Sequence, residues 1–263
     1  MPAAHEIADA AWGLAEPVPV AWRSGRWSLE LRGDELADLR CDGVLLARSI
    51  RFAARDRDWS TVPLLSVAAS GSLRVDAVYA GLGARWTATL EVAATDERLD
   101  VRLDAVSEGP WERARVGLVL LHPPEVAGRP LRVDHPDGSS AATVFPAAIS
   151  PHQPAFDIRA LGWSVDGLAV RAEFAGEVFE MEDHRNWTDA SFKTYGTPLG
   201  LPQPVALPAG ARVTQAITLA VDGRGSPAAA PLPGPWTRRA RSAGTGAPWG
   251  RARSAPGLSL IHI

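Results

Sequence analysis

The densest group of polar side chains lies in residues 179–195, which read Phe-Glu-Met-Glu-Asp-His-Arg-Asn-Trp-Thr-Asp-Ala-Ser-Phe-Lys-Thr-Tyr. Its carboxylates, imidazole, guanidinium and amide could bind a polyhydroxylated ligand and exchange protons with it. The candidate binding residues are Glu182, Asp183, His184, Arg185, Asn186, Trp187, Asp189 and Lys193. In the alternative, the charged groups pair with one another and the aromatic residues anchor the loop to the core.

Two features of this segment bear on that choice. If a strand covers residues 179–184, side chains alternate between its faces, and Glu180, Glu182 and His184 share one face. Lys193 is the only lysine among 27 basic residues. In a chain that otherwise uses arginine, one retained lysine favours a role that needs a compact ammonium rather than a planar guanidinium.

Two further segments are weaker candidates. Residues 149–159 contain His152 between prolines, together with other donors and acceptors. His152 could contact a ligand, or it could be a loop residue bonded to backbone. Residues 55–61 carry alternating charges at a predicted strand end, and solvated ion pairs explain them.

Several chemistries have no sequence support. The chain has no Gly-x-Ser-x-Gly elbow, no glycine-rich phosphate loop and no dinucleotide fingerprint. The six histidines are far apart and form neither His-x-His nor His-Glu-x-x-His. We therefore expect no cofactor and no metal, and the sequence assigns no catalytic residue.

Short alternating or apolar runs, separated by Gly, Pro or Asp, must position these side chains. This rhythm predicts an all-β fold, an antiparallel β-sandwich, in residues 1–223. Predicted strands cover residues 26–32, 35–41, 45–54, 64–69, 72–80, 84–93, 98–107, 114–121, 161–165, 168–174 and 213–221. The strands 84–93 and 98–107 form a predicted hairpin, whereas residues 122–154, with seven prolines, form a predicted long loop.

Composition limits the partners and the compartment. No apolar run approaches the roughly 20 residues of a membrane helix, so we expect no membrane partner. The start has no secretory pattern and Cys41 is the only cysteine, which favours the cytoplasm. Residues 1–223 hold 21 basic and 30 acidic residues. An acidic body without a basic stripe argues against nucleic acid as a partner.

Residues 224–263 differ from the rest and are expected to be disordered or artefactual. They contain six arginines, no acidic residue and no regular period. The final six residues, 258–263, read Leu-Ser-Leu-Ile-His-Ile, the translation of CTGTCTCTTATACACATC from a common sequencing adapter. We expect this hexapeptide to be adapter-encoded. A native disordered linker is the alternative.

The segment 179–195 resembles a signature of the D-apionate lactonase family, which usually has Gln where this chain has His184. Matching runs lie at residues 135–138 (His-Pro-Asp-Gly), 149–159 and 55–59. The resemblance implies an N-terminal supersandwich similar to galactose mutarotases, followed by a (β/α) barrel that this chain lacks. It also implies hydrolysis of a sugar-acid lactone in D-apiose catabolism, without assigning catalytic residues in this domain.

Three interpretations follow. The chain is the N-terminal domain of such a lactonase, inactive without its barrel, with the 179–195 segment completing the pocket for a sugar-acid lactone. Alternatively it is a stand-alone carbohydrate-binding or mutarotase-like module, which His152 facing Glu180 or Glu182 across a cleft would favour. The third is a structural sandwich that docks to the barrel, favoured if 179–195 is buried in its own salt bridges.

Overall fold

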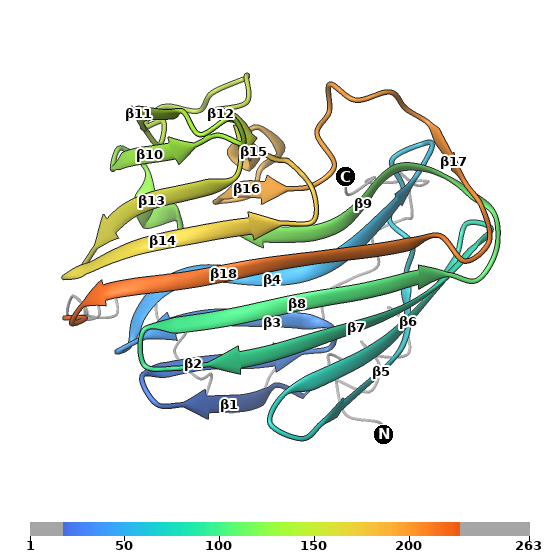
Figure 1. The fold of residues 1–263 in the computed structure, drawn as a ribbon, viewed down its shortest axis with the longest axis horizontal. Coiled ribbons are helices and arrows are strands. Elements are labelled where there is room, and N and C mark those ends of the chain that lie inside the picture. The colour runs from blue at the N-terminus through green and yellow to red at the C-terminus, as the bar shows by residue number, and fades with distance from the viewer. Residues whose placement is uncertain (1–17, 227–263) are drawn as a thin grey trace, which may run out of the picture. The chain divides into compact units, whose positions relative to one another are not determined.

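The computed structural model describes residues 18–226. These residues form two antiparallel sheets packed face to face, with two short 3₁₀ helices, η1 (Pro124–Val126) and η2 (His184–Trp187) (Figure 1). The predicted all-β sandwich is confirmed. The prediction for the tail concerns residues that, beyond 226, lie outside the described part.

Sheet A has nine strands in the order β1-β2-β3-β4-β9-β16-β15-β12, with β17 paired to β9. Their bounds are β1 Val20–Ser24, β2 Trp27–Arg32, β3 Glu35–Cys41, β4 Val44–Asp56, β9 Trp111–Leu121, β12 Ala155–Ile158, β15 Phe179–Asp183, β16 Phe192–Tyr195 and β17 Val205–Leu207. The long strands β4 and β9 lie at the centre of this sheet and pair with each other.

Sheet B also has nine strands, in the order β11-β10-β13-β14-β18-β8-β7-β6-β5. Their bounds are β5 Leu64–Ser70, β6 Arg74–Gly81, β7 Ala84–Ala94, β8 Arg98–Ser107, β10 Pro130–Asp134, β11 Ser140–Val144, β13 Ala160–Val165, β14 Leu168–Ala175 and β18 Arg212–Gly223. The predicted hairpin is β7 and β8, which pair from Trp86↔Ser107 to Ala94↔Leu99.

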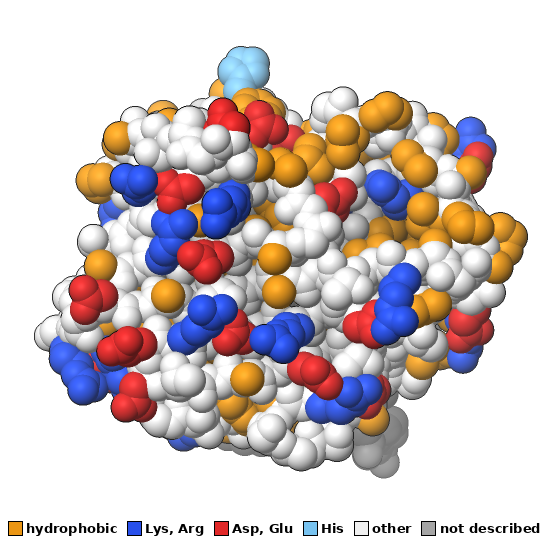
Figure 2. Space-filling model, viewed as in Figure 1, with side chains coloured by type: hydrophobic (Ala, Val, Ile, Leu, Met, Phe, Trp, Pro, Cys, Tyr) orange, Lys and Arg blue, Asp and Glu red, His pale blue; other side chains and the backbone are white. Residues whose placement is uncertain are grey.

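A period of two places one side of each strand in the core between the sheets. In β8, Leu99, Val101 and Leu103 are buried while Arg98 and Arg102 are exposed. The exposed positions carry charge, and basic and acidic side chains lie interspersed on the face that Figure 2 shows.

The core contains two aromatic groups that join the sheets. In one, the ring of Phe52 lies 5.0 Å from that of Tyr79 and 6.0 Å from that of Trp86. In the other, the His122 ring lies 5.4 Å from Phe145. Burial lowers the pKa of His122 to about 3, so this imidazole is a neutral core group rather than a base.

The region 122–154 is more ordered than its prolines predict. It contains η1 and the hairpin of β10 and β11, which extends sheet B. Strand β11 is exposed at all five positions and reads Ser-Ala-Ala-Thr-Val, so it has no alternation for a sequence pattern to detect. The prediction of a continuous loop was therefore wrong at these two strands.

Candidate functional site

The polar segment 179–195 folds as a β-hairpin. Strand β15 pairs with β16, which in turn pairs with β9, so the segment is an integral part of sheet A. Between the strands, η2 begins where the Asp183 side chain accepts a hydrogen bond from the backbone N–H of Arg185. The predicted alternation holds through Asp183, and cross-strand pairing places Glu182 opposite Lys193.

The inward side of the hairpin is a closed set of ion pairs and hydrogen bonds. Asp183 is fully buried and accepts from Arg185 Nε and Nη2, each at 2.8 Å, and from the Ser150 backbone N–H at 2.7 Å. Burial raises the pKa of Asp183, but the hydrogen bonds from Arg185 and from the Ser150 backbone N–H, together with the Arg185 charge, lower it overall.

This inward set also fixes the loop before β12. The Arg185 guanidinium donates to the carbonyls of Pro146, Ala147 and Ala148, and Asn186 Nδ2 donates to the Ser150 carbonyl. All four hydrogen bonds are accepted by backbone carbonyl oxygens. The predicted binding residues Asp183, Arg185 and Asn186 thus hold the loop in place in this structure.

The outward side presents a chain of charged groups. Lys193 Nζ lies 2.7 Å from Glu182 Oε2 and 3.1 Å from His184 Nε2. His184 Nδ1 lies 3.4 Å from Asp189 Oδ2, and Asp189 pairs with Arg48 at 2.7 Å. Four of the predicted residues are therefore adjacent, and Arg48 joins them from β4.

Burial affects the protonation of Lys193 and His184. It lowers the pKa of Lys193, although Glu182 opposes the shift. Burial and the Lys193 charge lower the pKa of His184, which favours a neutral ring whose Nε2 accepts from the Lys193 ammonium. The result is a hydrogen-bonded ammonium, imidazole and carboxylate on one face, a set that can bind hydroxyl groups and move protons.

Trp187 and His152 lie at the margins. Trp187 is 52% exposed, and its Nε1 donates to Glu182 Oε1 at 2.8 Å, so an aromatic ring stands beside the charged chain. His152 is exposed, and its backbone makes the hydrogen bonds of its turn with Ser150. Among the described residues, His152 makes no hydrogen bond or ion pair with Glu180 or Glu182.

Two arginines that share this outward face were not predicted from the sequence. Arg115 on β9 is 6% exposed, and its guanidinium lies 3.5 Å from the Tyr195 ring and 5.1 Å from the Trp59 ring. Arg55 on β4 lies directly opposite Arg115. The interpretation of residues 55–61 as ion-paired holds for Arg57, which pairs with Glu112, and not for Arg55.

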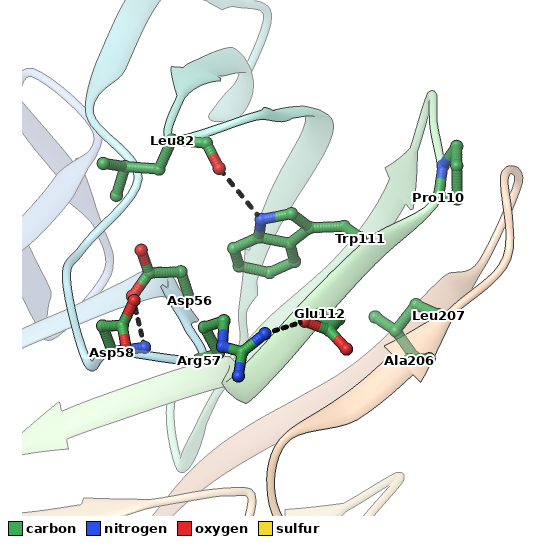
Figure 3. A pocket seen from close by; sticks show the side chains of 9 residues that line it. All are labelled: Asp56, Arg57, Asp58, Leu82, Pro110, Trp111, Glu112, Ala206 and Leu207. Atoms are coloured by element: carbon green, nitrogen blue, oxygen red, sulfur yellow. Dashed lines mark hydrogen bonds and ion pairs between the residues drawn. The ribbon is translucent and has the colours of Figure 1, made fainter.

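An open depression of about 490 Å³ lies elsewhere, where β17 meets the ends of β4 and β9 (Figure 3). Its polar groups bond to one another: Arg57 pairs with Glu112 at 2.8 Å, and Trp111 Nε1 donates to the Leu82 carbonyl at 3.3 Å. None of the predicted binding residues lines it. We therefore place the candidate site on the outward face around Lys193.

Residues 18–226 contain no group of three or more His, Cys, Asp or Glu side chains arranged to hold a metal ion. They also contain no helix that is both long enough and apolar enough to cross a membrane.

Comparison with known proteins gives the family and the fold. A D-apionate lactonase from Brucella anthropi is 36% identical over 220 residues, which cover 78% of this chain and 35% of that protein. A putative aldose 1-epimerase from Escherichia coli K12 aligns with a TM-score of 0.52 at 12% identity, covering 78% of this chain and 99% of that one.

A galactose mutarotase-like protein from Lactobacillus casei aligns with a TM-score of 0.51 at 11% identity, covering 78% of this chain and all of that one. At such identities the likeness shows the fold alone, and it confirms the expected mutarotase-like sandwich. The family described as D-apionate lactonase, N-terminal domain, matches residues 7–224. This chain therefore belongs to the D-apionate lactonase N-terminal domain family.

Proposed function

We propose that this chain is the N-terminal domain of a cytoplasmic hydrolase that opens a sugar-acid lactone in D-apiose catabolism. Family membership supports the reaction class, and the chain spans 35% of the length of the lactonase it matches. One observation supports a role for this domain in binding. Glu182, Lys193 and His184 lie on the outward face of sheet A, where they contact one another and border the surface.

Lactone hydrolysis needs water to attack the ring carbonyl, an acid to protonate the departing alkoxide, and donors that stabilise the oxyanion. In our proposal the reacting groups lie on a following (β/α) barrel, at the C-terminal ends of its strands. The domain described here supplies binding groups. The Lys193 ammonium and Glu182 carboxylate bond ligand hydroxyls, and the half-exposed Trp187 ring covers an apolar face of the sugar.

A chimera tests this proposal, with residues 7–224 replacing the matching domain of the Brucella lactonase. Proton release from D-apionolactone is followed in a pH-stat. We expect the 263-residue chain alone to be inactive, the chimera to be active, and Lys193→Met in the chimera to raise KM about tenfold, the loss expected for one charged hydrogen bond. Unchanged KM and kcat in this variant would contradict a binding role.

A stand-alone carbohydrate-binding or mutarotase-like module is the second candidate. It is favoured by the fold, because the aldose 1-epimerase-like structure aligns over 99% of its own chain and so consists of this sandwich alone. The arrangement of His152 opposite Glu180 or Glu182 that would support it is not observed. Exchange of sugar anomers catalysed by the chain alone, measured by NMR, would establish this function instead.

A further inference from the structure

Two arginines face each other at the centre of sheet A. Arg55 on β4 and Arg115 on β9 are direct cross-strand partners, and both point to the outward face. Directly opposed side chains on antiparallel strands have Cβ atoms about 5 Å apart, and like charges at such positions destabilise a sheet. The chain keeps this repulsion at the most central pair of strands.

Neither arginine is hydrogen-bonded to a carboxylate among residues 18–226. Arg51 and Arg57, the flanking arginines of β4 and the turn after it, pair with Asp34 and Glu112, but no ion pair in residues 18–226 includes Arg55. Arg115 has only Glu180, at 4.0 Å, which is beyond hydrogen-bond distance.

One donor of Arg115 is buried and unused. Its Nε has no hydrogen-bond partner among the described residues, although the side chain is only 8% exposed. An unpaired buried donor of a charged group is costly, so such a group calls for a partner that residues 18–226 do not supply. The Tyr195 and Trp59 rings flank the guanidinium and limit where that partner can approach.

The surrounding charge is positive. Lys193 adds a third cation, and the nearby carboxylates are engaged: Glu182 with Lys193, Glu180 with the Tyr195 hydroxyl at 2.5 Å and a backbone N–H, and Glu177 with Thr197 and Gln215. Burial and then the Arg115 charge lower the pKa of Arg55, and both arginines oppose the charge of Lys193. A bound anion would relieve this repulsion.

We propose that Arg55 and Arg115 form a carboxylate subsite that binds a small hydroxy-acid anion. A planar guanidinium fork suits a planar carboxylate, and the neighbouring Lys193 and aromatic rings suit a hydroxylated carbon chain. The choice of hydroxy acid rests on the proposed function: a lactone is neutral, whereas its hydrolysis product carries a carboxylate. The subsite therefore distinguishes the opened acid from the closed ring.

Calorimetric titration of the full 263-residue chain with sodium D-apionate tests the subsite, at low salt and about pH 6, where this carboxylate is ionised. We expect saturable binding that weakens on addition of NaCl, because salt screens the partly exposed charges. Arg55→Gln should weaken D-apionate binding about tenfold or more, the loss expected for a charge-assisted hydrogen bond. Arg102→Gln, which removes one exposed arginine from sheet B, should leave it unchanged.

A second variant separates binding from folding. Arg115→Lys keeps the buried charge and removes the fork, so it should weaken D-apionate binding while the far-UV circular dichroism stays that of the wild type. Wild-type affinity in both Arg55→Gln and Arg115→Lys would overturn the subsite. Stronger binding of inorganic phosphate than of D-apionate would overturn the assignment to a carboxylate.

Binding of the neutral lactone tests the proposed function separately from the carboxylate subsite. Freshly dissolved D-apionolactone, followed by saturation-transfer NMR, should bind in a manner that depends on Lys193 and not on Arg55. Lactone binding without D-apionate binding would overturn the subsite and leave the proposed function standing. Binding of neither ligand would contradict both.

Discussion

The outer faces of the two sheets both carry arginines at alternating strand positions, but the arginines have different surroundings. On sheet B, Arg98 lies 2.9 Å from Asp100 and is half-exposed. On sheet A, Arg55 faces Arg115 and neither makes a hydrogen-bonded ion pair within residues 18–226. An alternating pattern therefore identifies the arginines that lie on the outer face of a sheet. Only the structure shows which of them lack a hydrogen-bonded carboxylate and could bind a ligand.

The largest expected effect is at the buried pair of sheet A. Lys193→Ala removes the partner of Glu182, with side-chain exposures of 9% and 21% for the two residues. An uncompensated carboxylate at this depth should lower the free energy of unfolding by about 2–3 kcal/mol, since breaking a buried ion pair is strongly destabilising. Urea denaturation followed by circular dichroism measures the change.

A matched double variant isolates the cause. Replacing both charges, as in Lys193→Met with Glu182→Leu, leaves no unpaired charge and should restore most of the lost stability. If the double variant were as unstable as Lys193→Ala, lost packing rather than the unpaired charge would explain the effect.

Acid should reduce the stability that the ion pairs of Asp134 on sheet B contribute. Burial would raise the pKa of Asp134, but hydrogen bonds from Arg171 and Arg132 lower it overall. Because the folded pKa is below the unfolded value of about 3.9, this pair stabilises the fold above that pH and the contribution is lost as pH falls toward the folded pKa. Asp134→Asn should flatten the acid limb of a plot of unfolding free energy against pH.

A substitution in the opposed pair Arg55 and Arg115 on sheet A gives the contrasting result in the same plot of unfolding free energy against pH. Arginine stays protonated throughout the acid range, so Arg55→Gln should shift that plot vertically and leave its acid slope unchanged. A change in acid slope for Arg55→Gln equal to that for Asp134→Asn would show that the two faces do not differ as the structure indicates.

Much of the fold could be predicted from the sequence because alternation is a local signal. The predicted strands 35–41 and 98–107 coincide with β3 and β8, where one face is apolar and the other polar. Short strands such as β11, β16 and β17 escaped prediction. Strand β16 is buried at all four positions and β11 is exposed at all five, so neither has alternation to detect.

The candidate site could be predicted only in part, because a contact between distant strands has no local signature. The polar density of residues 179–195 pointed to Lys193, Glu182 and His184, which the fold brings together. It could not reveal that β9 would place Arg115 beside β16, nor that register would set Arg55 opposite it. The predicted alternation put Asp183 on the face opposite Glu182, but it could not show which of the two faces points inward.

A smaller effect of opposite sign is expected at the opposed arginines. Arg55→Gln removes one of two like charges that face each other, so it should raise the free energy of unfolding by about 0.2–1 kcal/mol, the range for cross-strand pairs. Thermal unfolding without ligand measures this gain. A loss of stability would mean that Arg55 contributes to the fold, and the contrast between the faces would fail.

The smallest effect is expected on sheet B. Arg98 is an exposed partner of Asp100, and Arg98 Nη2 also donates to Thr218 Oγ1 at 3.2 Å. Exposed ion pairs are screened by water and salt, and many contribute nothing measurable, so Arg98→Gln should leave the melting temperature unchanged at about 0.15 M salt. Together with Arg55→Gln this makes a signed test, because the same substitution on two β-sheet faces should stabilise one and not affect the other. Equal responses of the two variants would mean that solvent, rather than the missing partner, governs both arginines.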